Sequence, residues 1–138
     1  MGFTVELLSD EPIMIVTGKG MITVQDFAEM FAASRKRLAG MSGPIYRILD
    51  VRESTTSFMD LIRMPQIASK GDEGSTTDPR IKPVLVGTTQ WVSLGRTIFE
   101  QPQFSSLHFP TFASMEDAML YARNQLASAS DESSTTVG

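Results

Sequence analysis

Apolar and polar residues alternate with two different periods along the chain, and each period predicts a type of element. Residues 3–7 alternate strictly, which is typical of a half-buried strand. The apolar run 13–16 predicts a second strand, and the turn residues 9–12 between the two favour an antiparallel hairpin. Gly18 and Gly20 are expected to end the second strand.

A helical period follows, over residues 24–39. Thr23 stands before it and Asp26 lies three residues later, which is the spacing of a capping box. Three cations at 35–37 fall in the last turn, where the helix dipole favours positive charge, and Gly40 is a plausible stop.

The middle of the chain predicts a strand and a second helix. Residues 44–51 are almost continuously apolar, as expected for a central strand. Ser57 is the best cap for a helix over 58–68, and Pro65 should kink or split that helix. Residues 70–79 form a loop by composition.

The last third of the chain repeats the same succession. A strand is predicted at 81–87, where Pro83 requires a position near the strand start or on an edge. Thr88 or Thr89 caps the next helix, and a short strand follows at 106–110.

The final helix begins after Ser114 and carries a regular apolar stripe as far as Leu126. Residues 128–138 are polar and show no period, so a disordered tail is expected there. The chain is therefore interpreted as one domain over 1–127 followed by that tail.

The order β-β-α-β-α-β-α-β-α predicts an α/β protein with a five-stranded mixed sheet and four helices. Crossovers between parallel strands are right-handed, so the later strands should run parallel to the second one.

Composition narrows the possible functions. Cysteine is absent and His108 is the only histidine, which excludes cysteine-ligated or His-based metal sites. The net charge of −4 argues against nucleic-acid binding. We expect no cofactor, no metal and no transmembrane segment, because no stretch is long and apolar enough to span a bilayer. A cytoplasmic location is expected.

Two segments end at the carboxyl edge of predicted parallel strands, where open α/β sheets bind ligands. One runs from 50 to 57 and the other from 87 to 91; both combine hydroxyls with a helix N-terminus, which offers donors to an anion. Helix capping alone is the alternative explanation. The candidate binding residues in these segments are Asp50, Arg52, Ser54, Ser57, Thr88, Thr89 and Trp91.

The predicted helix 58–68 is apolar on more than one side, so a second face has to be covered. Phe58, Leu61 and Ile62 are the candidate contact residues. A partner subunit, an apolar ligand, a membrane surface or simply the rest of the domain could cover them.

The succession of segments resembles the SpoIIAA-like, or STAS-like, proteins. The likeness rests on the hairpin, the helix ITVQDFAEMFAASRKRL, the strand ending LDVRE, the strand VLVG before a Trp-bearing helix, and a closing S-x-E-D-A helix. It covers nearly all of residues 3–126 and implies a binding or regulatory role without catalysis.

The resemblance also implies a candidate modification site. Anti-sigma-factor antagonists of this kind carry a phosphorylatable serine in a D-S-[ST]-G-L segment, whose matching place here is 50–58. Ser54 and Ser57 supply hydroxyls, but the Asp-Ser pair and the Gly-Leu step are missing. The fold is also topologically similar to lipid-carrier domains with an apolar cleft.

Three functional hypotheses follow. The first is a non-catalytic regulatory or protein-interaction module, homodimeric, with an unknown protein partner. The second is a binder of an apolar or lipid-like ligand under a mobile helix 58–68, with peripheral membrane association. The third is a hydrolase or transferase that uses Asp50.

Overall fold

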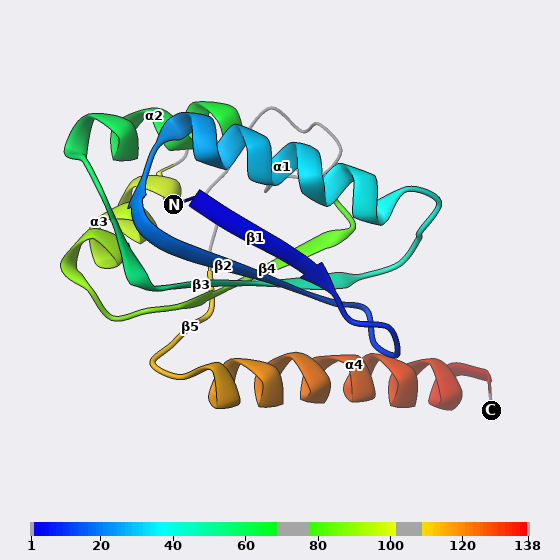
Figure 1. Ribbon diagram of the computed structural model, residues 1–138. Coiled ribbons are helices and arrows are strands. Elements are labelled where there is room, and N and C mark those ends of the chain that lie inside the picture. Colours follow the sequence, from blue (N-terminus) through cyan, green and yellow to red (C-terminus); the bar gives the residue numbers. More distant parts are fainter. Residues whose placement is uncertain (1, 69–77, 102–108, 138) are drawn as a thin grey trace.

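The computed structural model describes residues 2–68, 78–101 and 109–137, with the backbone alone at 67–68 and 129–137. A five-stranded sheet has the order β1-β2-β3-β4-β5 (Figure 1). β1 is antiparallel to β2, and the remaining neighbours are parallel. The elements are β1 (Gly2–Leu7), β2 (Ile13–Ile22), α1 (Val24–Leu38), β3 (Ile45–Thr56), α2 (Phe58–Ala68), β4 (Ile81–Val86), α3 (Gln90–Phe99), β5 (Thr111–Phe112) and α4 (Met115–Val137).

The predicted element order and the mixed sheet are confirmed, but β2 does not end at its glycines. Gly18 leaves room for the Phe3 ring on β1, since a Cβ there would lie 2.9 Å from it. Gly20 has φ +73°, and the register with β3 shifts between Thr17 and Lys19. The glycines therefore serve a bulge inside a continuing strand, which is a common use of glycine in sheets.

β3 is also longer than the predicted 44–51. It continues to Thr56 because the extended end of β2 pairs with it, Gly20 opposite Ser54 and Ile22 opposite Thr56. The Thr56 hydroxyl adds a 2.7 Å hydrogen bond to the Ile22 carbonyl. The segment expected to be a loop is thus the end of a long strand.

The first two helices start at their predicted caps, whereas Thr89 before α3 makes no side-chain capping bond. Thr23 and Asp26 form a complete capping box on α1, and the Ser57 hydroxyl accepts a bond from the Asp60 N–H on α2. Pro65 does not split α2, which runs on to Ala68 with Pro65 buried inside it.

The last strand lies later than predicted. β5 consists of Thr111–Phe112, whereas 106–110 was expected; residues 106–108, including His108, lie outside the described part of the chain. Leu85 donates its N–H to the Pro110 carbonyl on the β5 side. Pro83 lies two residues earlier, so its nitrogen faces the same side. β5 has not yet begun there, so the lack of an N–H on Pro83 costs no hydrogen bond of the sheet.

α4 begins after Ser114, whose hydroxyl accepts from the Asp117 N–H. Its backbone continues to Val137, so residues 128–137 differ from the disordered tail that their composition predicts. Once a helix has started, each added hydrogen bond fixes only one more residue. Residues with a weak helix propensity can therefore extend a helix whose first turns are well packed. The domain limit at residue 127 stays a prediction.

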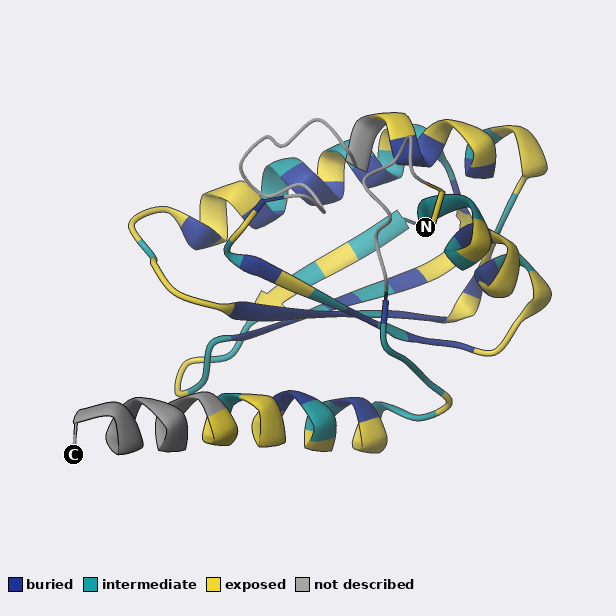
Figure 2. Ribbon diagram, turned by 180° about the vertical axis from the view of Figure 1, so that it is seen from behind, coloured by how far each residue is buried: buried dark blue, intermediate teal, exposed yellow. Residues whose placement is uncertain are grey.

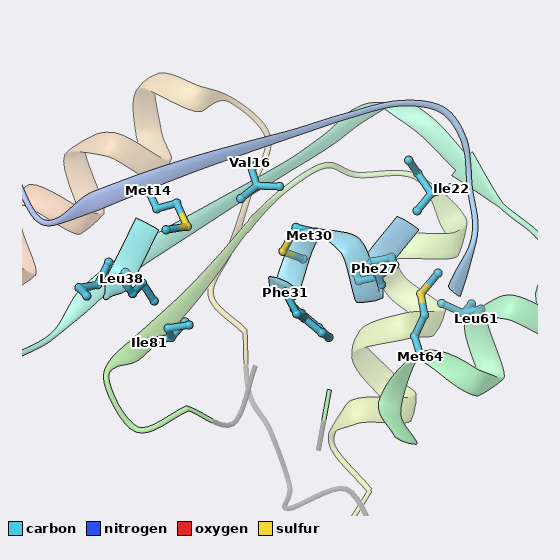
Figure 3. Packing of buried hydrophobic residues seen from close by; sticks show 11 residues of the cluster. Met14, Val16, Ile22, Phe27, Met30, Phe31, Leu38, Leu61, Met64 and Ile81 are labelled. Carbon is cyan, nitrogen blue, oxygen red and sulfur yellow. The ribbon is translucent and has the colours of Figure 1, made fainter. Parts of the chain in front are cut away.

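The helices cover the two faces of the sheet unequally. α1, α2 and α3 lie on one face and α4 lies alone on the other (Figure 1). The central strands are buried between these layers, and the helices are exposed on their outer sides (Figure 2). On the first face, Leu61 and Met64 of α2 meet Phe27 of α1 within the larger apolar cluster (Figure 3).

Candidate functional site

A cavity of about 70 Å³ lies beneath α2, between the sheet and the three-helix layer. Leu61 and Met64 of α2, Phe27 of α1 and Val92 of α3 contribute to its walls, and Val51 of β3 contributes to its floor. No described residue of α4 lines it. The elements that line this space also carry most of the site residues predicted from the sequence.

Arg47 places a charge in this apolar layer. It is the third residue of β3, only 4% exposed, and it lines the cavity. It donates to the hydroxyl of the buried Ser34 on α1 at 3.3 Å, and its guanidinium lies 5.3 Å from the centre of the Phe31 ring. Burial lowers the pKa of Arg47 to about 10, an effect opposed by the charge of Asp78, so it stays protonated at neutral pH.

Asp78 is fixed by a second arginine. Arg80 donates to both carboxylate oxygens of Asp78, at 3.2 and 2.8 Å. It also donates to the carbonyls of Leu38, the last residue of α1, and of Met41. The start of β4 is thereby tied to the end of α1, with a carboxylate held near enough to Arg47 to raise its pKa.

Arg96 on α3 is another cation at the cavity. Its Nε atom is buried and has no hydrogen-bond partner among the described residues. Because Arg96 lines the cavity, its guanidinium places a second positive charge at the cavity wall.

The two segments predicted to meet at the carboxyl edge of the sheet do lie together. The Trp91 indole N–H, at the start of α3, donates to the Ser54 carbonyl at the end of β3 with a distance of 3.1 Å. Trp91 also lines the cavity. One turn later, Gly95 allows Leu61 of α2 to approach α3 closely, since a Cβ at 95 would lie 3.2 Å from it.

Asp50 and Arg52 lie outside the cavity, and they bind each other. Arg52 donates to both carboxylate oxygens of Asp50, at 3.0 and 2.8 Å. The hydrogen bonds from Arg52 lower the pKa of Asp50. A carboxylate held in this way is a weak base, so the geometry gives no support to a catalytic role for it.

The hydroxyl residues predicted as binding residues from the sequence are partly buried and partly exposed. Ser54 is buried and donates to the Val51 carbonyl, whereas Ser57 is exposed at the start of α2. Thr88 and Thr89 are exposed, and Thr89 precedes α3 without a capping bond from its side chain. The structure does not gather these hydroxyls around a common point.

α2 is apolar on both of its sides, as its sequence predicts. Leu61 and Met64 face inward and are buried. Phe58, Met59 and Ile62 are 61%, 59% and 40% exposed, and spacings of three and four residues place them on one side of the helix. We call these three residues the exposed α2 surface.

Sequence reasoning missed Arg47 and Arg96. The signal for Arg47 was present, because a lone charge at an inward position of an otherwise apolar strand is rare unless it is paired. Arg96 looks like an ordinary last-turn cation, and only the packing of α3 shows that its Nε is buried.

The described residues hold no group of three acidic or histidine side chains that could bind a metal ion. None of the described helices is long and apolar enough to cross a membrane.

Comparison with known proteins gives structural matches alone. No protein-family model matches the sequence, and no curated protein matches it. An uncharacterized protein of the DUF3478 family with a SpoIIAA-like fold, from Shewanella loihica PV-4, superposes with a TM-score of 0.57 at 17% identity, over 87% of this chain and 91% of that one. An anti-sigma factor antagonist from Mycobacterium paratuberculosis gives 0.51 at 16% identity, over 88% and 95%.

This chain has the SpoIIAA-like fold. The resemblance inferred from the order of segments is therefore confirmed at the level of the fold.

Proposed function

We propose that this protein is a non-catalytic regulatory module of the STAS-like kind, acting in the cytoplasm as a homodimer through protein contact. The observation that carries the proposal is the exposed α2 surface, three large apolar side chains side by side on one helix. Clustered exposed apolar residues commonly mark protein-contact sites. The similarity to an anti-sigma factor antagonist, a protein named for its action on a regulator, supports the same role.

Of the two serines suggested as phosphorylation sites, Ser57 fits this proposal better. It is exposed and directly precedes Phe58, so a phosphate there would add negative charge beside the exposed α2 surface. Ser54 is buried and donates its hydroxyl proton within β3, which leaves it out of reach of a kinase.

Sedimentation of matched variants tests the proposal. Ile62→Glu places a charge on the exposed α2 surface, and Leu120→Glu makes the same change at a 58% exposed leucine of α4 on the other face of the sheet. We expect wild type and Leu120→Glu to sediment as dimers at micromolar concentration, and Ile62→Glu as a monomer. A monomeric wild type, or equal weakening by both substitutions, would refute the proposed contact face.

A second candidate function is the binding of an apolar or lipid-like ligand under α2, with peripheral membrane association. The cavity beneath α2 is the observation that favours it. Hydrogen exchange at fixed protein concentration tests it, because a ligand that binds the folded state raises protection. In a series of fatty acids from short to long chains, at least one should slow exchange in α2 and leave α4 unchanged. No change in α2 at any chain length would remove this candidate.

A further inference from the structure

Among the described residues that line the cavity, the charged ones are all of one sign. Arg47 and Arg96 are the two of them, and none of the described lining residues is acidic. The rest of the wall is almost entirely apolar. Such a lining favours a ligand with one anionic group and an apolar body, since the low polarity around the arginines strengthens their attraction for an anion.

Arg96 is the better placed of the two to bind the anionic group. Arg47 is already engaged with Ser34 and lies over Phe31. Arg96 lines the same cavity, and its Nε makes no hydrogen bond to a described residue. A guanidinium forms short, charge-assisted hydrogen bonds with a carboxylate, so Arg96 is the cation with which an anionic group in the cavity would pair.

The size of the cavity limits the apolar body. At about 70 Å³ it is roughly half the size of the engineered cavity of about 150 Å³ that holds benzene. A chain of a few carbons fits that volume, whereas a long acyl chain would require α2 to move away from the sheet.

We propose that the cavity beneath α2 binds a short-chain aliphatic carboxylate, with its carboxylate on Arg96 and its alkyl chain between Leu61, Val92 and Val51. The inference rests on the second candidate function, and it specifies the class of ligand and the residue that recognises its charge.

The chain carries its own reporter for a test. Trp91 is its only tryptophan, and it lines the cavity. The full-length protein is titrated with butyrate and, separately, with the isosteric neutral butyramide, with sodium chloride replacing sodium butyrate to hold ionic strength constant. Tryptophan fluorescence and the amide resonances of Val92 and Gly95 are followed.

We expect butyrate to bind at least about tenfold more tightly than butyramide, because the amide lacks the charge that Arg96 recognises. Affinity should rise from acetate to butyrate and fall at hexanoate, when the volume is exceeded. Arg96→Met should abolish the preference for butyrate while retaining binding of butyramide. Arg63→Met removes an exposed cation from α2 outside the lining and should leave the preference intact.

The outcomes separate the inference from the function on which it rests. Equal affinities for butyrate and butyramide, or an unchanged preference in Arg96→Met, would overturn the carboxylate assignment and leave an apolar ligand site. No saturable response to either probe would overturn both, and would leave a cavity that water fills. Circular dichroism and thermal melting confirm that each variant is folded.

Discussion

The sheet carries one helix on one face and three on the other, and the two layers are packed with side chains of different sizes. Under α4, Ala118 and Ala122 lie fully buried against Ile48, Val84 and Val86 of the strands. Small helix residues against branched strand residues allow a close approach of α4 to the sheet. The ion pair between Arg123 of α4 and Glu11 lies at the exposed rim of this layer.

The three-helix layer is built from longer and more flexible side chains. Its buried apolar residues include three methionines and two phenylalanines, Met14, Met30, Met64, Phe27 and Phe31. Arg47 interrupts the apolar floor, Leu61 packs closely against Gly95 of α3, and the cavity lies among these residues. Interiors are normally packed without voids larger than a water molecule. The comparison thus indicates that α4 stabilises the fold, whereas the three-helix layer carries the features that can be used for binding.

The largest effect should come from removing the buried charge. Arg47→Ala removes the donor to the Ser34 hydroxyl and enlarges the cavity, so we expect the free energy of unfolding to fall by about 3 kcal/mol. Arg52→Ala removes an exposed cation of the same strand, paired with Asp50, and should cost much less. Urea unfolding measures both. Similar losses in the two variants would show that Arg47 is no more important to the fold than a surface cation.

Adding volume should have opposite effects on the two faces. Ala122→Val inserts two methyl groups into the close contact under α4 and should cost about 2 kcal/mol. Val92→Ile extends a side chain that lines the cavity and should stabilise the protein by up to about 0.8 kcal/mol, the contribution of one buried methylene. Melting temperatures of the two variants provide the measurement. A destabilising Val92→Ile would mean that the cavity cannot accept a methyl group.

The Asp50–Arg52 pair should make stability depend on pH. Hydrogen bonds from Arg52 lower the pKa of Asp50 in the folded state below its unfolded value of about 3.9. The stabilisation is therefore fully present above about pH 4 and is lost as the pH falls through the folded pKa. Because solvent screens the pair, Asp50→Asn should lower the free energy of unfolding by at most about 1 kcal/mol at pH 7, and its difference from wild type should vanish in acid. A difference between the two proteins that stays constant with pH would show that the loss is not electrostatic.

The smallest effect is expected for the end of α4. Residues 128–138 contribute no apolar stripe, so their deletion should change the free energy of unfolding by less than about 0.5 kcal/mol, or the melting temperature by a degree or two. A larger fall would show that the last turns of the helix contribute to the domain, and that its limit lies beyond residue 127.

Local signals predicted the fold well. Thr23 with Asp26, Ser57 and Ser114 each begin a helix because a side-chain oxygen satisfies free N–H groups one turn later, and both partners are visible in the sequence. The alternation of residues 3–7 likewise needs no tertiary information.

The errors arose where distant segments decide the structure. β3 extends to Thr56 because β2 extends beside it, and neither extension is visible in either segment alone. The candidate site shows the same division: Leu61 and Trp91 were predicted from the sequence and line the cavity. Arg96 was missed because its burial depends on how α3 packs against β3 and α2.

The central claim is that the exposed α2 surface contacts a second copy of the chain while α4 has a structural role. Hydrogen exchange measured at low and high protein concentration tests it most directly, because a dimer contact protects only the residues it covers. The account predicts that the amides of 58–66 gain protection as concentration rises, and that those of 115–127 do not. Equal protection of both helices at every concentration would contradict it and would make α2 an ordinary part of the core.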